Sequence, residues 1–154
     1  MPLLKVLFFI VLVFVAVTMW RTWRREKFRR SVALAEAEFA RERLKLQEDF
    51  RAAANVSGKP RGLRWKSVEF QDRILLARDR ANGELVGLAG ATIAFEAVAG
   101  GDMEDVEAVG NLRAGTAILT WKGHEWTTAG RAVFNLEPRQ VLEQYRESLN
   151  PVGA

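Results

Sequence analysis

The sequence predicts an α+β protein: an N-terminal transmembrane helix, an amphipathic connector helix, and a mostly antiparallel, five- or six-stranded curved sheet with a short C-terminal helix. Three observations predict it. Residues 3–20 are almost entirely apolar, residues 26–54 place apolar side chains at helical spacing, and from Leu63 onward apolar and polar side chains alternate. We therefore expect a transmembrane anchor at 1–23, a juxtamembrane connector helix at 24–57 and a soluble β-rich domain at 58–150.

The first segment has the length and composition of a membrane anchor. Between Leu3 and Trp20 the only charged residue is Lys5. A helix of this length extends about 27 Å and nearly spans the ~30 Å hydrocarbon core of a bilayer. A cleaved signal peptide is the alternative, but its basic residues would precede the apolar core. Here they follow it, and Ala16-Val-Thr18 only weakly approximates a cleavage site. We expect a retained signal anchor that crosses the membrane once.

The residues that follow the apolar core match a membrane interface. Tryptophan side chains favour the level of the headgroups, and basic side chains favour anionic headgroups. The predicted interface residues are Trp20, Arg21, Trp23, Arg24 and Arg25. Because basic flanking residues stay in the cytoplasm, we expect the N terminus outside and the soluble domain in the cytoplasm.

The net charge of +4 is unevenly distributed along the chain. Residues 21–66 contain fourteen basic and six acidic side chains, a net +8, whereas residues 67–110 contain three and nine, a net −6. The basic excess therefore lies beside the apolar segment, and the acidic excess lies in the domain. This placement indicates a lipid bilayer with anionic headgroups as one partner, and we expect no nucleic-acid binding.

Residues 26–54 have the composition of a long helix, with good helix formers and neither Gly nor Pro. Their apolar side chains recur at steps of three, four or seven and form one stripe: Phe28, Val32, Ala35, Phe39, Leu46 and Phe50. We expect this stripe to pack on the chain's own domain or to lie partly in the membrane interface. A coiled-coil homo-oligomer is the alternative, although Glu42 and Asp49 would then occupy seam positions. Residues 55–62, with Ser, Gly and Pro, end the helix.

The domain is expected to consist of strands joined mainly by hairpins. The expected strands are 63–70, with an irregularity near Ser67, then 74–79, 85–98, 103–109, 112–121 and 126–136. Asn82-Gly83 predicts a type I′ turn, because both residues tolerate a positive φ. Gly123-His124 predicts a type II′ turn that places Trp121 opposite Trp126.

Two further features complete the expected fold. The odd positions of 85–98 form an apolar face with small residues at its centre, where we expect the connector helix to approach closely. Pro138 suits the first turn of a last helix, whose expected apolar face is Val141, Leu142, Tyr145 and Leu149. In element order alone, this arrangement resembles the cystatin-like and NTF2-like rolls, in which a curved sheet wraps a long helix.

The sequence contains few groups that could carry chemistry. There is no cysteine and one histidine, His124, which excludes thiolate nucleophiles and multi-histidine metal sites. His124 lies at a predicted hairpin tip, with no nucleophile nearby in the sequence. The best candidate site is an acidic run: Asp102, Glu104, Asp105 and Glu107. Strand alternation would separate these carboxylates, so we expect a solvated or partner-facing acidic edge in preference to a cation site, and no cofactor.

These observations favour a non-enzymatic protein. The leading hypothesis is a single-pass membrane-anchored interaction, scaffold or accessory-subunit protein with a cytoplasmic α+β domain and a protein partner. The alternative is a membrane-tethered ligand-binding or catalytic roll domain, with a pocket between the sheet and the connector helix. Glu96 is the candidate buried acid of that pocket.

Overall fold

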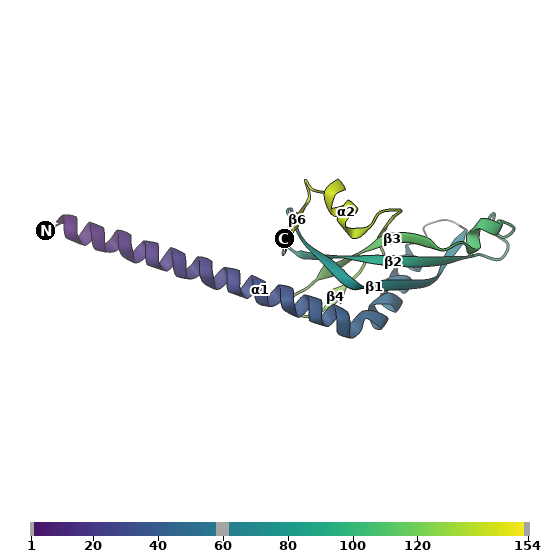
Figure 1. Cartoon of the computed structure of the whole chain (residues 1–154), viewed down its shortest axis with the longest axis horizontal. Helices are drawn as coiled ribbons and strands as arrows, with labels where there is room; N and C mark the ends of the chain where they lie inside the picture. Colours follow the sequence, from purple (N-terminus) through teal and green to yellow (C-terminus); the bar gives the residue numbers. More distant parts are fainter. Residues whose placement is uncertain (1, 58–61, 153–154) are drawn as a thin grey trace. The chain divides into compact units, whose positions relative to one another are not determined.

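The computed structural model describes residues 2–57 and 62–152, with side chains from residue 5 onward (Figure 1). The chain forms two compact units, Met1–Leu34 and Ala35–Ala154. One helix, α1 (Pro2–Val56), runs without interruption from the first unit into the second. The expected anchor and connector are therefore two stretches of the same helix.

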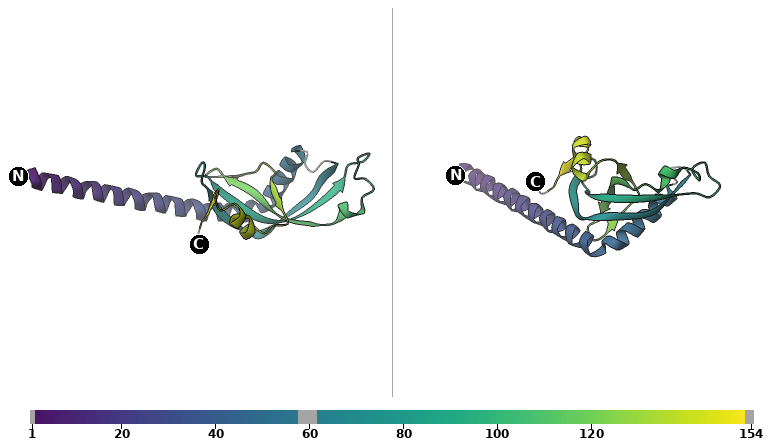
Figure 2. Two further views of the ribbon diagram at one scale, coloured as in Figure 1. Left: turned by 90° about the horizontal axis from the view of Figure 1, so that it is seen from above. Right: turned by 45° about the vertical axis from the view of Figure 1, so that its right-hand side comes forward.

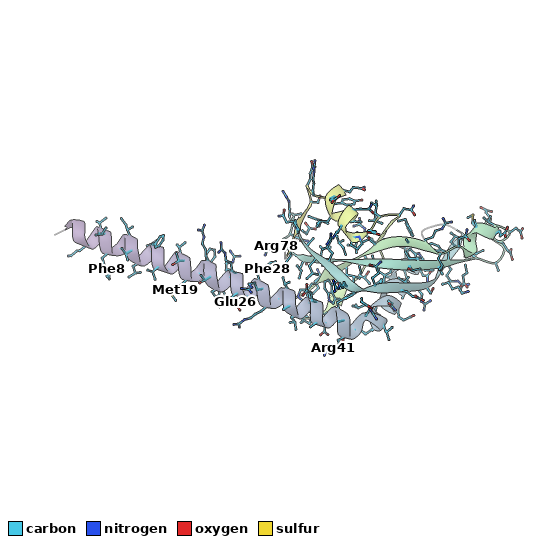
Figure 3. The ribbon with its side chains drawn as sticks, viewed as in Figure 1. Phe8, Met19, Glu26, Phe28, Arg41 and Arg78 are labelled. Carbon is cyan, nitrogen blue, oxygen red and sulfur yellow. The ribbon has the colours of Figure 1, made fainter. Side chains whose placement is uncertain are left out.

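The first unit is helical, and the apolar side chains of residues 6–17 are exposed, whereas Phe28 and Val32 are half-buried. Figure 3 shows Phe8 and Met19 projecting outward from α1, and their exposed fractions are 69% and 67%. In the part of the chain that the structure describes, α1 is the one helix that is long and apolar enough to cross a membrane, with a mean hydropathy of 2.1 over 18 residues. Within this stretch the hydroxyls of Thr18 and Thr22 donate to the carbonyls of Val15 and Met19, at 2.8 Å each, so they do not need water as a partner.

The second unit contains an open, curved antiparallel sheet, which Figure 2 shows from two further directions. Its strands are β1 (Leu63–Asp79), β2 (Leu85–Ala97), β3 (Arg113–Trp121), β4 (Trp126–Thr127), β5 (Ala132–Phe134) and β6 (Leu149–Pro151). Their order is β4-β3-β2-β1-β6, and β5 also pairs with β3. A 3-10 helix, η1 (Glu107–Gly110), and a short helix, α2 (Pro138–Gln144), complete the unit. The predicted α+β class is confirmed.

The part of α1 that belongs to the second unit packs one stripe of side chains on the sheet. The stripe members are at most 1% exposed: Ala35, Phe39, Leu46, Phe50 and Ala54. Phe39 stacks on Phe70 with ring centroids 6.2 Å apart, and Phe50 meets Trp65 edge to face at 5.8 Å. From Ala35 onward, the predicted stripe is therefore the helix's contribution to the core.

The small-residue face of β2 is filled by an aromatic ring from the next hairpin. A Cβ built on Gly87 would lie 2.7 Å from the Trp126 ring, so this position admits only glycine without movement. Trp126 in turn packs against Phe39 and donates its indole N–H to the carbonyl of Ala35 at 2.9 Å. The close approach was expected at this face, but the element that lies against Gly87 is Trp126, which lies between the sheet and the helix.

The opposite face of the sheet is covered by α2. Val141 is 1% exposed and packs with Val86 and Leu88 in a second, smaller core. Pro138 occupies the first turn as expected, and Glu137 and Gln140 form a reciprocal capping box. The helix ends at Gln144, so the predicted helical face through Leu149 is wrong: Tyr145 is 42% exposed, and Leu149 begins β6.

Several strand predictions need correction. The segments 63–70 and 74–79 form one strand, β1, whose register against β2 shifts between Trp65 and Ser67 and between Phe70 and Ile74. The first of these shifts confirms the expected irregularity near Ser67. Residues 103–109 form turns and η1 in place of a strand.

The two predicted turns have different outcomes. Among the described residues other than glycine, only Asn135 has a positive φ, so Asn82 cannot be part of a type I′ turn. The loop is instead closed by Gly83, with φ +74°, whose N–H donates to the carbonyl of Asp79 at 2.9 Å. The second hairpin has the expected pairing of Trp121 with Trp126, but its return strand is divided into β4 and β5.

Candidate functional site

An apolar pocket lies on the helix-covered face of the sheet, beyond the end of the helix. Cross-strand pairs share a face of the sheet, and the pairs Trp65–Phe95, Ile93–Arg113 and Gly115–Phe134 connect four lining side chains on the α1 side. α1 ends at Val56, and the next residue, Ser57, lines the pocket.

The pocket has a volume of about 770 Å³, within the ~300–1,000 Å³ range of small-molecule sites. Its lining comes from the end of α1, from β1, β2, β3 and β5, and from the segment that joins β2 to β3. The lining residues are Ser57, Leu63, Trp65, Phe95, Met103, Val106, Ala108, Val109, Arg113, Ala129, Gly130, Arg131, Ala132, Phe134 and Asn135.

Three aromatic rings form the floor of the pocket. Trp65 contacts Phe95 at 5.0 Å between ring centroids and Phe134 at 5.9 Å, and the two phenylalanines are 6.1 Å apart. Trp65 and Phe95 are buried, whereas Phe134 remains 38% exposed. Mutual packing restricts the three rings, so the floor is formed before any ligand arrives.

The segment 98–111 forms one wall of the pocket. Successive turns hold it in place: the N–H of Gly101 donates to the carbonyl of Val98 at 2.9 Å, and that of Val106 to Met103 at 3.2 Å. Met103 and Val106 line the pocket, and Val106 is 41% exposed. The wall therefore presents apolar side chains to the cavity from a segment without strand pairing.

The predicted acidic residues lie on this same wall and not on a strand edge. Asp102, Glu104, Asp105 and Glu107 are all exposed, and none of them lines the pocket. Glu104 accepts a hydrogen bond from the N–H of Gly100 at 2.8 Å and so supports the turn. Among the residues described, no group of three or more His, Asp or Glu side chains is placed to hold a metal ion.

Among the described residues, the charged ones that line the pocket are Arg113 and Arg131. The Arg113 guanidinium lies 3.5 Å from the carbonyl oxygen of Ala108, at the junction of floor and wall. Neither arginine forms an ion pair within 2–57 and 62–152. Within the part of the lining that the structure describes, an apolar interior is thus combined with two cations and no carboxylate.

Glu96 does not have the role expected of a pocket acid. Its carboxylate pairs with Arg64 at 3.0 Å, its side chain is 43% exposed, and it does not line the pocket. The pocket lies beyond the end of the helix, whereas the hypothesis expected one between the sheet and the connector helix, and Glu96 is not part of its lining. His124 is exposed at the tip of the second hairpin, 3.6 Å from the Glu125 carboxylate.

The predicted interface residues lie on the exposed helix of the first unit, within about one and a half turns. Arg24 lies over the Trp20 ring at 4.6 Å, and Lys27 lies over the Trp23 ring at 5.5 Å. Each pair is four residues apart, so a helix brings it together without tertiary packing. Arg21 and Arg25 are also exposed.

Sequence reasoning did not identify Arg113, Phe134 or Met103 as site residues. The available signal was the position of Arg113, at the start of β3 and on the face that is otherwise apolar. For Phe134 and Met103 the sequence gives no such signal: Phe134 reaches the pocket through the pairing of β5 with β3, and Met103 lies in the turns of the segment 98–111. Asn135, with φ +60°, is a second unpredicted feature of this rim.

No family model, curated protein or solved structure matches this chain.

Proposed function

We propose that this chain is a single-pass membrane-anchored interaction or accessory-subunit protein, with its folded domain in the cytoplasm. The observation that carries the proposal is the apolar stretch of α1, of which no part is buried. A core helix of a soluble protein would be mostly buried, whereas this one exposes side chains such as Phe9 (67%) and Phe14 (68%). Exposed apolar surface of this extent favours lipid as its surroundings.

The proposed orientation rests on the basic residues at the end of the apolar stretch. Arg21, Arg24 and Arg25 outnumber Lys5 at the other end, and all four are exposed. Basic residues next to a membrane span favour the cytoplasmic side. Trp20 and Trp23, which lie beneath the cations of Arg24 and Lys27, suit the headgroup level of that leaflet.

The anchor is tested with the full chain in its native membrane. We expect the protein to stay in the membrane pellet after carbonate extraction, with an intact mass that includes the apolar stretch. Release into the supernatant, or a mature mass lacking the first residues, would contradict the anchor.

The orientation can be measured by cysteine labelling, since the chain contains no cysteine. His124→Cys, at an exposed hairpin tip, should resist a membrane-impermeant maleimide in intact cells and react after lysis. Pro2→Cys, on the other side of the membrane, should already react with the maleimide in intact cells. Labelling of His124→Cys in intact cells would overturn the cytoplasmic placement.

The proposed partner contact involves the exposed acidic segment. The motivating observation is that Asp105 and Glu107 are exposed and form no ion pair among the described residues. We would purify the full chain in mild detergent and compare Asp105→Lys/Glu107→Lys with Glu143→Lys/Glu147→Lys, a matched reversal elsewhere on the surface. Loss of a stoichiometric partner only in the first variant supports this contact, and an unchanged partner set in both variants removes it.

A further inference from the structure

We propose that the pocket beyond the end of α1 binds a long-chain fatty acid, with the acyl chain on the aromatic floor and the carboxylate at Arg113 and Arg131. This assigns a ligand class to a site that the membrane-anchored interaction function does not use. The proposal combines three properties of one cavity: its volume, its apolar lining and its charge.

The floor and the wall favour an extended apolar ligand. Trp65, Phe95 and Phe134 contact one another and leave the face of Phe134 partly exposed. Met103 and Val106 line the same cavity, and the unbranched Met103 side chain can adapt to a flexible chain. Covering these side chains with methylene groups removes apolar surface from water, which favours binding in proportion to the area covered.

The position of Arg113 favours an anionic group on that ligand. Arg113 pairs with Ile93 across the β2–β3 ladder, so it belongs to the face whose other members are buried and apolar. The alternative explanation for an arginine there is that its charge simply keeps the exposed start of β3 hydrated. However, its guanidinium lies near the Ala108 carbonyl, inside the lining, and a second arginine lines the same cavity.

Charge also distinguishes the ligand from other apolar molecules. Among the described residues the lining contains two arginines and no Asp or Glu, and both arginines are exposed, so this positive rim attracts an anionic headgroup in preference to a neutral one. A carboxylate can accept two parallel N–H bonds from one guanidinium, and such charge-assisted bonds are stronger than neutral ones. A short carboxylate would leave the aromatic floor uncovered. Both parts of a fatty acid are therefore needed.

The test is photo-crosslinking of the full chain in phosphatidylcholine nanodiscs with a diazirine derivative of palmitic acid. Adducts are mapped by mass spectrometry. Lipid-exposed residues of α1 between 5 and 23 should be labelled simply because the probe partitions into the bilayer, and they report its concentration there. Labelling of the 103–109 wall and of Phe134 should be saturable and displaced by unlabelled palmitic acid.

The variants separate the two halves of the proposal. Arg113→Glu/Arg131→Glu should weaken pocket labelling by about tenfold or more, because a charge-assisted bond to the carboxylate is replaced by repulsion. Arg73→Glu/Arg139→Glu is the matched control, since both arginines are exposed and neither lines the pocket. Ala108→Trp should fill the cavity from an exposed position and abolish pocket labelling, while labelling of residues 5–23 stays unchanged. Near-ultraviolet circular dichroism of each variant verifies that the domain is folded.

Each alternative outcome has a definite meaning. Labelling confined to residues 5–23 overturns the proposal. Equal competition by hexadecanol and palmitic acid, or pocket labelling that survives Arg113→Glu/Arg131→Glu in a folded protein, overturns the assignment of an anion. Failure of the anchor or orientation tests leaves this result unaffected, because pocket labelling is read from different residues.

Discussion

At Gly87 the sheet approaches the Trp126 ring so closely that a side chain does not fit. The two neighbours that a Cβ would meet are the Ile74 methyl and the indole of Trp126. Trp126 is 5% exposed and is fixed on its other side by Phe39 and by the Ala35 carbonyl. Because the ring cannot move outward without breaking these contacts, the absence of a side chain at position 87 determines how closely the second hairpin can lie against β2.

We expect Gly87→Ala to lower the free energy of unfolding by about 1–3 kcal/mol, the usual cost of overpacking a well-packed core. The matched control is Gly110→Ala, where a Cβ meets no atom within 4 Å and φ is not positive, so the change should be within about 0.5 kcal/mol. Urea denaturation of both variants measures the difference. Equal stability of the two variants would show that the Trp126 ring can move aside at little cost in free energy, which contradicts the prediction.

At the scale of elements, α1 hydrogen-bonds to β1 at both places where that strand loses register with β2. The Asn55 side chain accepts from the Trp65 N–H at 2.9 Å and donates to the Trp65 carbonyl at 3.2 Å. The Gln47 carbonyl oxygen accepts from the Phe70 N–H at 2.8 Å. Unpaired backbone groups in a partly buried strand are costly, so these helix side chains take the place of the strand partner that β1 lacks there.

We expect Asn55→Ala to destabilise the domain by about 1–3 kcal/mol, because it removes both hydrogen bonds between the Asn55 side chain and the Trp65 backbone in a partly buried place. Asn55→Asp should recover only part of this loss, since a carboxylate accepts from the N–H but repels the carbonyl. Asn111→Ala, an exposed asparagine, is the control and should be nearly neutral. Thermal unfolding followed by circular dichroism distinguishes the three variants, and a neutral Asn55→Ala would contradict the role of this contact.

The elements that the sequence predicted correctly are those with a strong local pattern. The helical stripe around Phe39 and Phe50 reflects a single buried face, so hydrophobic spacing is enough to find it. β2 is a nearly continuous run of apolar and small residues, buried on both faces over its first half, and this composition indicates a strand. The segment 103–109 has neither pattern and folds into turns. The pocket was likewise not predictable residue by residue: Phe134 meets Trp65, and Arg113 joins the same face, only through cross-strand register, which local spacing does not contain.

At the scale of the whole molecule, the boundary between the two units lies inside α1 and not at the loop that follows it. The compact unit that contains the sheet begins at Ala35, 23 residues before the domain boundary expected at residue 58. The side chains of Phe39, Leu46 and Phe50 are at most 1% exposed, and their partners Trp65 and Phe70 belong to β1. The helix therefore supplies much of the core on one face of the sheet.

This arrangement predicts different behaviour for two truncated chains. Residues 31–152 should be soluble and monomeric and should unfold cooperatively, whereas 58–152 should aggregate or remain unfolded. Burial of the three large side chains of α1 contributes roughly 5–9 kcal/mol, comparable with the ~5–15 kcal/mol total stability of a domain.

Within 31–152, Leu46→Ala should cost about 2–5 kcal/mol, as expected for a buried leucine. Leu44→Ala is its control at 74% exposure and should change little. Size-exclusion chromatography and denaturant unfolding measure both comparisons. A monomeric 58–152 with the unfolding midpoint of 31–152 would show that the sheet folds without the helix, and would return the boundary to residue 58.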